Sequence, residues 1–188
     1  MRSPHSFIIR PEGGSKYSSI KKINGEDIVM SATIEDASYT NRYAQIVSTP
    51  SGYVGDIEDG ATIITHHNTF RTINNMLGNE EASSAFIKDD MYFIDHDTIY
   101  MYKNIGKEWI VNSPYCFVKP VDKIQGFLLS IENYEKQHGI IKFAPQGSIE
   151  IGQYIVFSPD SEYEFDIDGE LLYRMKLNDI CLILNQEY

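Results

Sequence analysis

The sequence predicts an all-β protein, because short apolar runs of strand length recur along its 188 residues with turn residues between them. Between Tyr163 and Ile167, apolar and acidic residues alternate with the period of two that is typical of a strand with one solvated face. Asp168-Gly169 follows directly, and this dipeptide favours the tight type I′ turn of a β-hairpin. We therefore expect a barrel or sandwich of short strands with little helix.

Each expected strand is a short apolar or alternating run, and turn residues lie between successive runs. Before Pro120 the expected strands are Asp27–Ala32, Tyr43–Ser48, Thr62–Thr65, Met91–Ile94, Ile99–Tyr102, Trp109–Val111 and Tyr115–Val118. After it they are Gly126–Ser130, Gly139–Phe143, Tyr154–Phe157, Tyr163–Ile167, Leu171–Met175 and Ile180–Leu184. One helix is expected at Thr72–Leu77, with Gly78 as its stop.

The composition limits the classes of partner. The net charge is −11, with no dense basic cluster to offset it, so we expect no binding to nucleic acid. No apolar stretch is long enough to span a membrane and no secretory signal is visible, which predicts a cytoplasmic protein. Cys116 and Cys181 both lie in apolar runs, so both are expected to be buried, reduced thiols within strands.

The chain contains a weak internal repeat. Ala44-Gln45-Ile46-Val47 up to Pro50 matches Gly139-Ile140-Ile141-Lys142-Phe143 up to Pro145, and Ile57–Ile64 matches Ile149–Val156. The apolar runs Ile28-Val29-Met30-Ser31 and Phe127-Leu128-Leu129-Ser130 precede them in the two copies. The offset between the copies drifts slowly along the chain, as expected for one fold used twice with different loop lengths.

The second copy resembles a subunit of the GroES-type co-chaperonin family. The matching motifs are Lys119-Pro120, the apolar run Phe127–Ser130, a Gly-led strand from Gly139, Ile151-Gly152-Gln153-Tyr154-Ile155-Val156-Phe157, and a closing Asp179-Ile180-Cys181-Leu182-Ile183-Leu184. The first copy resembles the family more weakly. The resemblance implies two GroES-like β-barrel domains in tandem: a flexible N-terminal arm at 1–19, a first domain at 20–117 with an insertion at 66–97, and a second domain at 118–188.

The resemblance also implies a chaperonin as partner. In this family a long loop after the first strand carries an apolar triplet that follows glycines and docks on the chaperonin. With Ile28–Ser31 and Phe127–Ser130 as first strands, the corresponding loops are 33–42 and 131–138, which are short and lack such a triplet. The apolar residues that remain as candidate partner-binding anchors are Ile34, Tyr39, Ile131 and Tyr134.

Two other patterns contain residue types that can bind metal ions. His66-His67 and Asp95-His96-Asp97 contain metal-ligating residue types, but adjacent residues of a strand face opposite sides, and a surface turn is favoured at 95–97. The acidic residues Glu162, Glu164, Asp166 and Asp168 suit the solvated face of a hairpin better than a calcium site. No phosphate-binding loop, nucleophile elbow or metalloprotease motif is present, so we expect neither enzymatic activity nor a cofactor.

The resulting hypothesis is a co-chaperonin-like protein that assists protein folding or assembly as a homo-oligomeric ring, acting as the lid of a chaperonin. The alternative is a non-enzymatic structural or virion assembly protein that reuses the barrel without binding a chaperonin. Frequent Asn, Ile, Lys and Tyr residues favour a viral origin, in which case the protein acts in the host cytoplasm.

Overall fold

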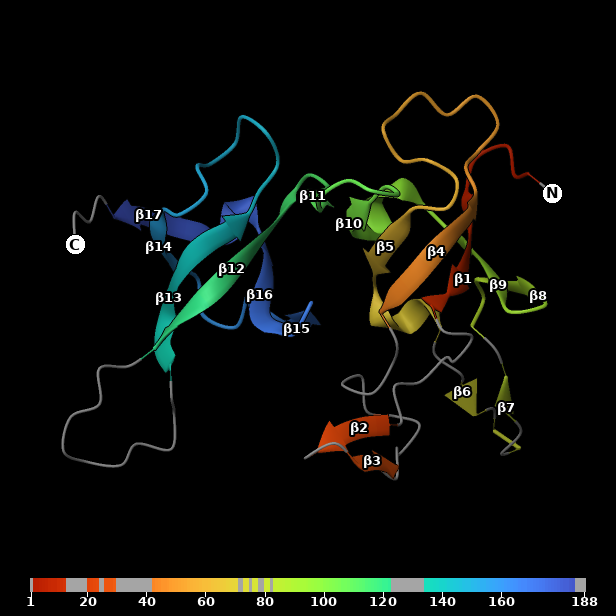
Figure 1. Ribbon diagram of the computed structural model, residues 1–188, viewed down its shortest axis with the longest axis horizontal. Helices are drawn as coiled ribbons and strands as arrows, with labels where there is room; N and C mark the ends of the chain where they lie inside the picture. The colour runs from red at the N-terminus through yellow and green to blue at the C-terminus, as the bar shows by residue number, and fades with distance from the viewer. Residues whose placement is uncertain are drawn as a thin grey trace. The chain divides into compact units, whose positions relative to one another are not determined.

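The protein is all-β and divides into two units. The computed structural model describes residues 2–12, 20–23, 26–29, 42–70, 73–74, 76–77, 80–81, 83–122 and 134–184. Their strands form two antiparallel sheets and two isolated hairpins, and these ranges contain no α-helix (Figure 1). The first unit ends at Trp109 and the second begins at Ile110. The all-β prediction and its two β domains are confirmed.

The first unit is built on a seven-stranded sheet in the order β11-β10-β5-β4-β1-β9-β8 (Figure 1). The strands of the first unit in this sheet are β1 (Phe7–Pro11), β4 (Tyr43–Ser48), β5 (Thr62–Thr65), β8 (Phe86–Lys88), β9 (Met91–Ile94) and β10 (Ile99–Lys103). The seventh strand, β11 (Ile110–Val111), comes directly after the boundary at Trp109. Two hairpins lie outside this sheet, one from β2 (Ile20–Ile23) and β3 (Glu26–Val29), the other from β6 (Ile73–Asn74) and β7 (Glu80–Glu81).

The second unit is built on a six-stranded sheet in the order β15-β16-β12-β13-β14-β17. Its strands are β12 (Tyr115–Asp122), β13 (Tyr134–Phe143), β14 (Tyr154–Phe157), β15 (Tyr163–Ile167), β16 (Glu170–Lys176) and β17 (Ile180–Leu184). The predicted turn joins β15 to β16: Asp168 and Gly169 both have positive φ, 53° and 84°, as a type I′ turn requires.

The two sheets have the same strand order, which confirms the internal repeat. Strands β1, β4, β5, β8, β9 and β10 correspond in turn to β12, β13, β14, β15, β16 and β17. The register agrees residue by residue: Ile9 faces Ile46 in the first unit, and Val118 faces Ile141 in the second. Both first strands also shift register one residue earlier, between Ile8 and Ile9 and between Phe117 and Val118. The correspondence begins at β1, so the first copy starts earlier than residue 20.

Each unit has its own hydrophobic core at equivalent positions. At five equivalent positions both cores have a buried residue: Phe7 and Cys116, Ile9 and Val118, Ile46 and Ile141, Ile63 and Ile155, and Ile94 and Met175. Full burial of one such isoleucine contributes about 1.5–3 kcal/mol. In both copies the residues at these positions face the core. Their burial therefore stabilises the same strand register in each sheet.

The structure corrects the expected N-terminal arm and the start of the first domain. Phe7, Ile8 and Ile9 are at most 1% exposed, and β1 lies inside the sheet between β4 and β9. The flanking Pro and Gly residues indicated a loose segment, but the short apolar run between them buries enough surface to form an inner strand. The predicted domain boundary between 117 and 118 falls within β12.

Three further expectations differ from the structure. The described strands form open sheets instead of closed barrels, because no ladder joins the two edge strands of either sheet. The helix expected at Thr72–Leu77 is replaced at Ile73–Asn74 by β6, whose partner β7 supplies backbone hydrogen bonds. Cys116 is buried as expected, whereas Cys181 is exposed because β17 is an edge strand.

The insertion expected at 66–97 has counterparts in the second unit over part of its length. β8 and β9 form a hairpin like that of β15 and β16, and both hairpins lie at the end of their sheet. Within 66–97, the residues without a counterpart in the second unit therefore lie between β5 and β8.

Candidate functional site

The connection between the first and second strands of each unit is the candidate partner-binding element. It runs from residue 12 to residue 42 in the first unit and from 123 to 133 in the second. The first connection includes the β2–β3 hairpin, in which Ile20 pairs with Val29 and Ile23 with Glu26. In the chain, the apolar runs Ile28-Val29-Met30 and Phe127-Leu128-Leu129 come between these strands; Ile28 and Val29 belong to β3, and residues 30 and 127–129 lie outside the described residues.

The expectation that Asp27–Ala32 is the first strand of its sheet is wrong, because β1 precedes it in the chain and lies inside the sheet, whereas the strand expected at Gly126–Ser130 lies outside the described residues. Gly25 precedes the first apolar run by three residues, and Gly126 directly precedes the second. β1 and β12 were not expected to be the equivalent first strands of the two units. The signal that could have located them is the pair of motifs Ile9-Arg10-Pro11 and Val118-Lys119-Pro120, which occupy equivalent positions in β1 and β12.

The four anchors expected from the sequence are not brought together by any described contact. Ile34, Tyr39 and Ile131 lie outside the described residues. Tyr134 is the first residue of β13, where its backbone pairs with Asp122 of β12.

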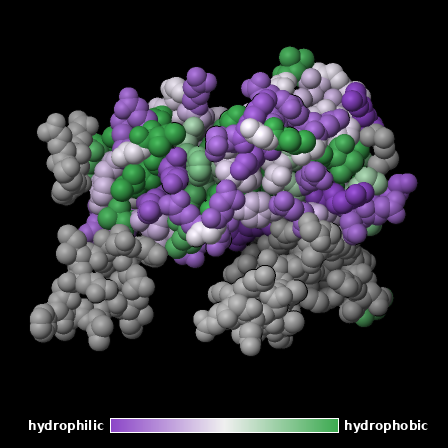
Figure 2. Space-filling view, in the orientation of Figure 1, coloured by the Kyte–Doolittle hydropathy of each residue, from purple (hydrophilic) through white to green (hydrophobic). Residues whose placement is uncertain are grey.

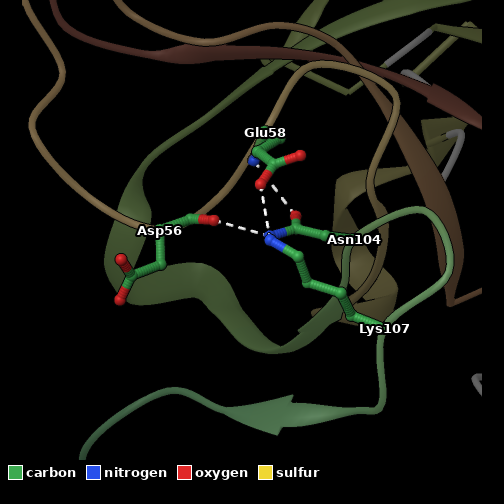
Figure 3. A network of polar contacts seen from close by, with 4 residues as sticks. All are labelled: Asp56, Glu58, Asn104 and Lys107. Carbon is green, nitrogen blue, oxygen red and sulfur yellow. Dashed lines mark hydrogen bonds and ion pairs between the residues drawn. The ribbon is translucent and has the colours of Figure 1, made fainter.

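A buried polar network holds the second connection of the first unit, the loop between β4 and β5. Asn104 is 2% exposed; its side-chain amide donates to the backbone carbonyl of Asp56 (2.7 Å) and accepts from the backbone N–H of Glu58 (3.1 Å). The Nζ of Lys107 contacts the Glu58 carboxylate at 2.7 Å (Figure 3). A buried amide whose N–H and carbonyl groups are both hydrogen-bonded rigidifies the loop that it contacts. We therefore interpret this network as structural.

The residues weighed as metal ligands have structural contacts of their own. The Nδ1 of His66 accepts a hydrogen bond from the Asn68 N–H and caps the 3-10 turn η3 (His67–Thr69). The His96 ring lies 6.1 Å from the ring of Phe7, and the Asp95 carboxylate accepts a hydrogen bond from the Ser6 hydroxyl. Within the described ranges, no three His, Cys, Asp or Glu side chains are grouped so as to hold a metal ion.

Comparison with models of known protein families and with curated proteins found no match for this chain. None of the helical turns in the described part of the chain is long and apolar enough to cross a membrane.

Proposed function

We propose that this protein is a co-chaperonin-like assembly factor that binds a chaperonin through the connection following the first strand of each unit. The observation that carries the proposal is the duplicated sheet: both copies share strand order and register, and both have a Gly-preceded apolar run in that connection. The resemblance to GroES-type co-chaperonins implies a chaperonin-docking triplet at this same position.

The mechanism would be geometric and would involve no bond chemistry. Each chain would offer two apolar runs, Ile28-Val29-Met30 and Phe127-Leu128-Leu129, to apolar grooves of the chaperonin. Single contacts of this size are weak, but a homo-oligomeric ring presents many at once, and linkage of the sites raises the overall affinity by orders of magnitude. A closed ring bound in this way would act as a lid.

The test is binding of the purified protein to a purified chaperonin with and without ATP, followed by light scattering and co-sedimentation. Val29→Ser and Leu128→Ser together should abolish the complex, because each removes a central apolar anchor worth about 2 kcal/mol or more at such interfaces. A second double variant, Tyr39→Ser with Ile131→Ser, tests the anchors expected from the sequence. Val54→Ser, at a fully exposed apolar residue, is the neutral control.

The outcomes separate the candidate functions. Loss of binding only in the first pair supports the proposal as stated. Loss only in the Tyr39 and Ile131 pair moves the contact to the later part of the connections. Absence of any complex between the unmodified protein and the chaperonin contradicts the proposal and favours the non-enzymatic structural or virion assembly protein.

A further inference from the structure

The connection from β5 to β8 in the first unit is much longer than its equivalent in the second unit. It runs over residues 66–85, whereas β14 and β15 are joined by residues 158–162, which form no strand. The longer connection contains the 3-10 turn η3 and the hairpin of β6 and β7, in which Asn74 pairs with Glu80. This hairpin therefore belongs to the first unit alone, and neither of the two proposed docking connections includes it.

The turn of the β6–β7 hairpin exposes two adjacent large apolar side chains. Met76 and Leu77 lie in this turn; Met76 is fully exposed and Leu77 is 85% exposed. Residues 72–79 carry no charge, in a chain whose net charge is −11. Figure 2 shows hydrophobic residues at the surface where Figure 1 labels β6 and β7. Single apolar residues are common on protein surfaces, but an adjacent and uncharged pair in a hairpin turn is suited to enter an apolar groove.

The two ends of the hairpin segment are fixed to the first unit. At its start, Phe70 is fully buried, and its ring contacts that of Tyr92 on β9 edge-on, at 5.0 Å between centroids. At its end, the Ser83 hydroxyl donates a hydrogen bond of 2.7 Å to the Thr69 carbonyl, which closes the base of the segment. A segment that is anchored at both ends loses less conformational entropy on binding than a free loop does.

The hairpin segment leaves the sheet at the same end as the first docking connection. β4 and β5 are antiparallel neighbours, so the end of β5 lies beside the start of β4. There the Thr65 N–H donates a hydrogen bond of 3.0 Å to the carbonyl of Arg42, the last residue of that connection. The connection 12–42 and the segment 66–85 therefore emerge from adjacent strands at one end of the first unit.

We propose that the β6–β7 hairpin is a third chaperonin-binding element of each chain. Met76 and Leu77 enter an apolar groove of the chaperonin, beside the groove that receives Ile28-Val29-Met30. This inference rests on the proposed function and adds a contact that comes from the first unit. The two units then bind with unequal strength, because the first uses two elements and the second uses one.

The first experiment measures the affinity of the purified chain for a purified chaperonin in the presence of ATP. Met76→Ser with Leu77→Ser removes both apolar side chains, and we expect the affinity to fall by roughly tenfold or more. Met76→Leu with Leu77→Met keeps the apolar character and should bind as the unmodified chain does. Circular dichroism checks that each variant is folded.

The matched control is Val54→Ser with Ile105→Ser, which also removes two exposed apolar side chains of the first unit. Val54 lies between β4 and β5, and Ile105 follows β10. Because β5 is antiparallel to both β4 and β10, these two residues lie in loops at the opposite end of the sheet. This pair should leave the affinity unchanged.

Oxidation of methionine gives a second readout that needs no substitution. Hydrogen peroxide transfers one oxygen atom to the exposed thioether of Met76 and is itself reduced to water, whereas Met101 and Met175 are fully buried. Mass spectrometry should show that Met76 is oxidised before these two residues in the free chain. In the chaperonin complex we expect its oxidation to slow by roughly tenfold or more, because the thioether is covered.

The outcomes distinguish this inference from the proposed function. Weaker binding of the folded serine pair, with Met76 protected in the complex, supports the inference. It is overturned, while the proposed function stands, if the serine pair binds like the unmodified chain or if Met76 is oxidised equally fast in the complex. An equal loss of affinity in the Val54 and Ile105 pair, or in the Met76→Leu and Leu77→Met exchange, also overturns it. Absence of any complex with the unmodified chain overturns both the inference and the proposed function.

Discussion

Gly60 and Gly152 close the same backbone turn in the two units. Their φ values are 88° and 91°, and each donates its N–H, at 2.8 Å, to the carbonyl of the facing isoleucine, Ile46 or Ile141. That isoleucine in turn donates to the residue after the glycine, at 2.8 Å for Ala61 and 2.9 Å for Gln153. These reciprocal bonds hold β4 against β5, and β13 against β14, in one register.

Replacing either glycine with alanine should destabilise its own unit. Gly152→Ala meets no neighbouring atom, so its cost is the backbone strain of a left-handed L-residue, about 1–2 kcal/mol. Gly60→Ala should cost at least as much, since its Cβ would lie 3.3 Å from the Ile105 side chain. Urea unfolding measures both. Gly152→Asn should recover part of the loss, because asparagine tolerates this conformation; equal losses for Ala and Asn would contradict the explanation.

Removing the Asn104 side chain should destabilise the first unit. Asn104→Ala leaves the Glu58 N–H and the Asp56 carbonyl without their partner in a partly buried place, which costs about 1–3 kcal/mol. Lys107→Ala, which removes only the exposed ion pair to Glu58, should change stability by less than about 1 kcal/mol. Thermal unfolding of both variants makes the comparison, and similar effects would show that the amide is not the main contributor.

The turn between β8 and β9 should be improved by glycine. Asp89 and Asp90 both have positive φ, 49° and 57°, and join two paired strands in two residues, as Asp168 and Gly169 do in the second unit. Asp90→Gly should therefore stabilise the first unit by roughly 0.5–1 kcal/mol, and Gly169→Ala should destabilise the second. A decrease in the unfolding midpoint for Asp90→Gly would exclude strain at this turn.

The pH dependence of stability should show the buried thiol of Cys116. Burial, with a smaller contribution from the Asp179 carboxylate, raises its pKa to about 12 from an ordinary value of 9.0, against the opposing effect of Arg174. The unfolded chain then loses this proton at lower pH than the folded one, so the contribution to stability is complete below pH 9 and is lost between about pH 9 and 12.

Unfolding in urea at pH 8, 9 and 10 tests this, because the slope above pH 9 should be shallower in Cys116→Ala than in the unmodified chain. Cys181→Ala, at the exposed thiol, is the control for the loss of a cysteine. Burial also raises the pKa values of Tyr53 and Tyr102, so both proteins should still lose stability at the highest pH.

Much of the secondary structure could be predicted from the chain alone. Strands at Tyr43–Ser48, Thr62–Thr65, Met91–Ile94, Tyr154–Phe157, Tyr163–Ile167 and Ile180–Leu184 have the predicted bounds. These runs are short, either apolar or alternating in polarity, and have turn residues near them, which are local properties. β1 was missed because its apolar run is short and lies between residues that favour loops, and Asp27–Ala32 was expected as the first strand as a result.

The amino-acid sequence by itself determined the all-β class, the turn at Asp168-Gly169 and the presence of two related halves, because each depends on residues close together in the chain. Only the tertiary structure decided that β1 is an inner strand, that the sheets stay open, and that Cys181 is exposed while Cys116 is buried. Those outcomes depend on which strands become neighbours. The sequence of an apolar run does not show whether another strand pairs with it, as at β10, or whether it forms the edge of the sheet, as at β17.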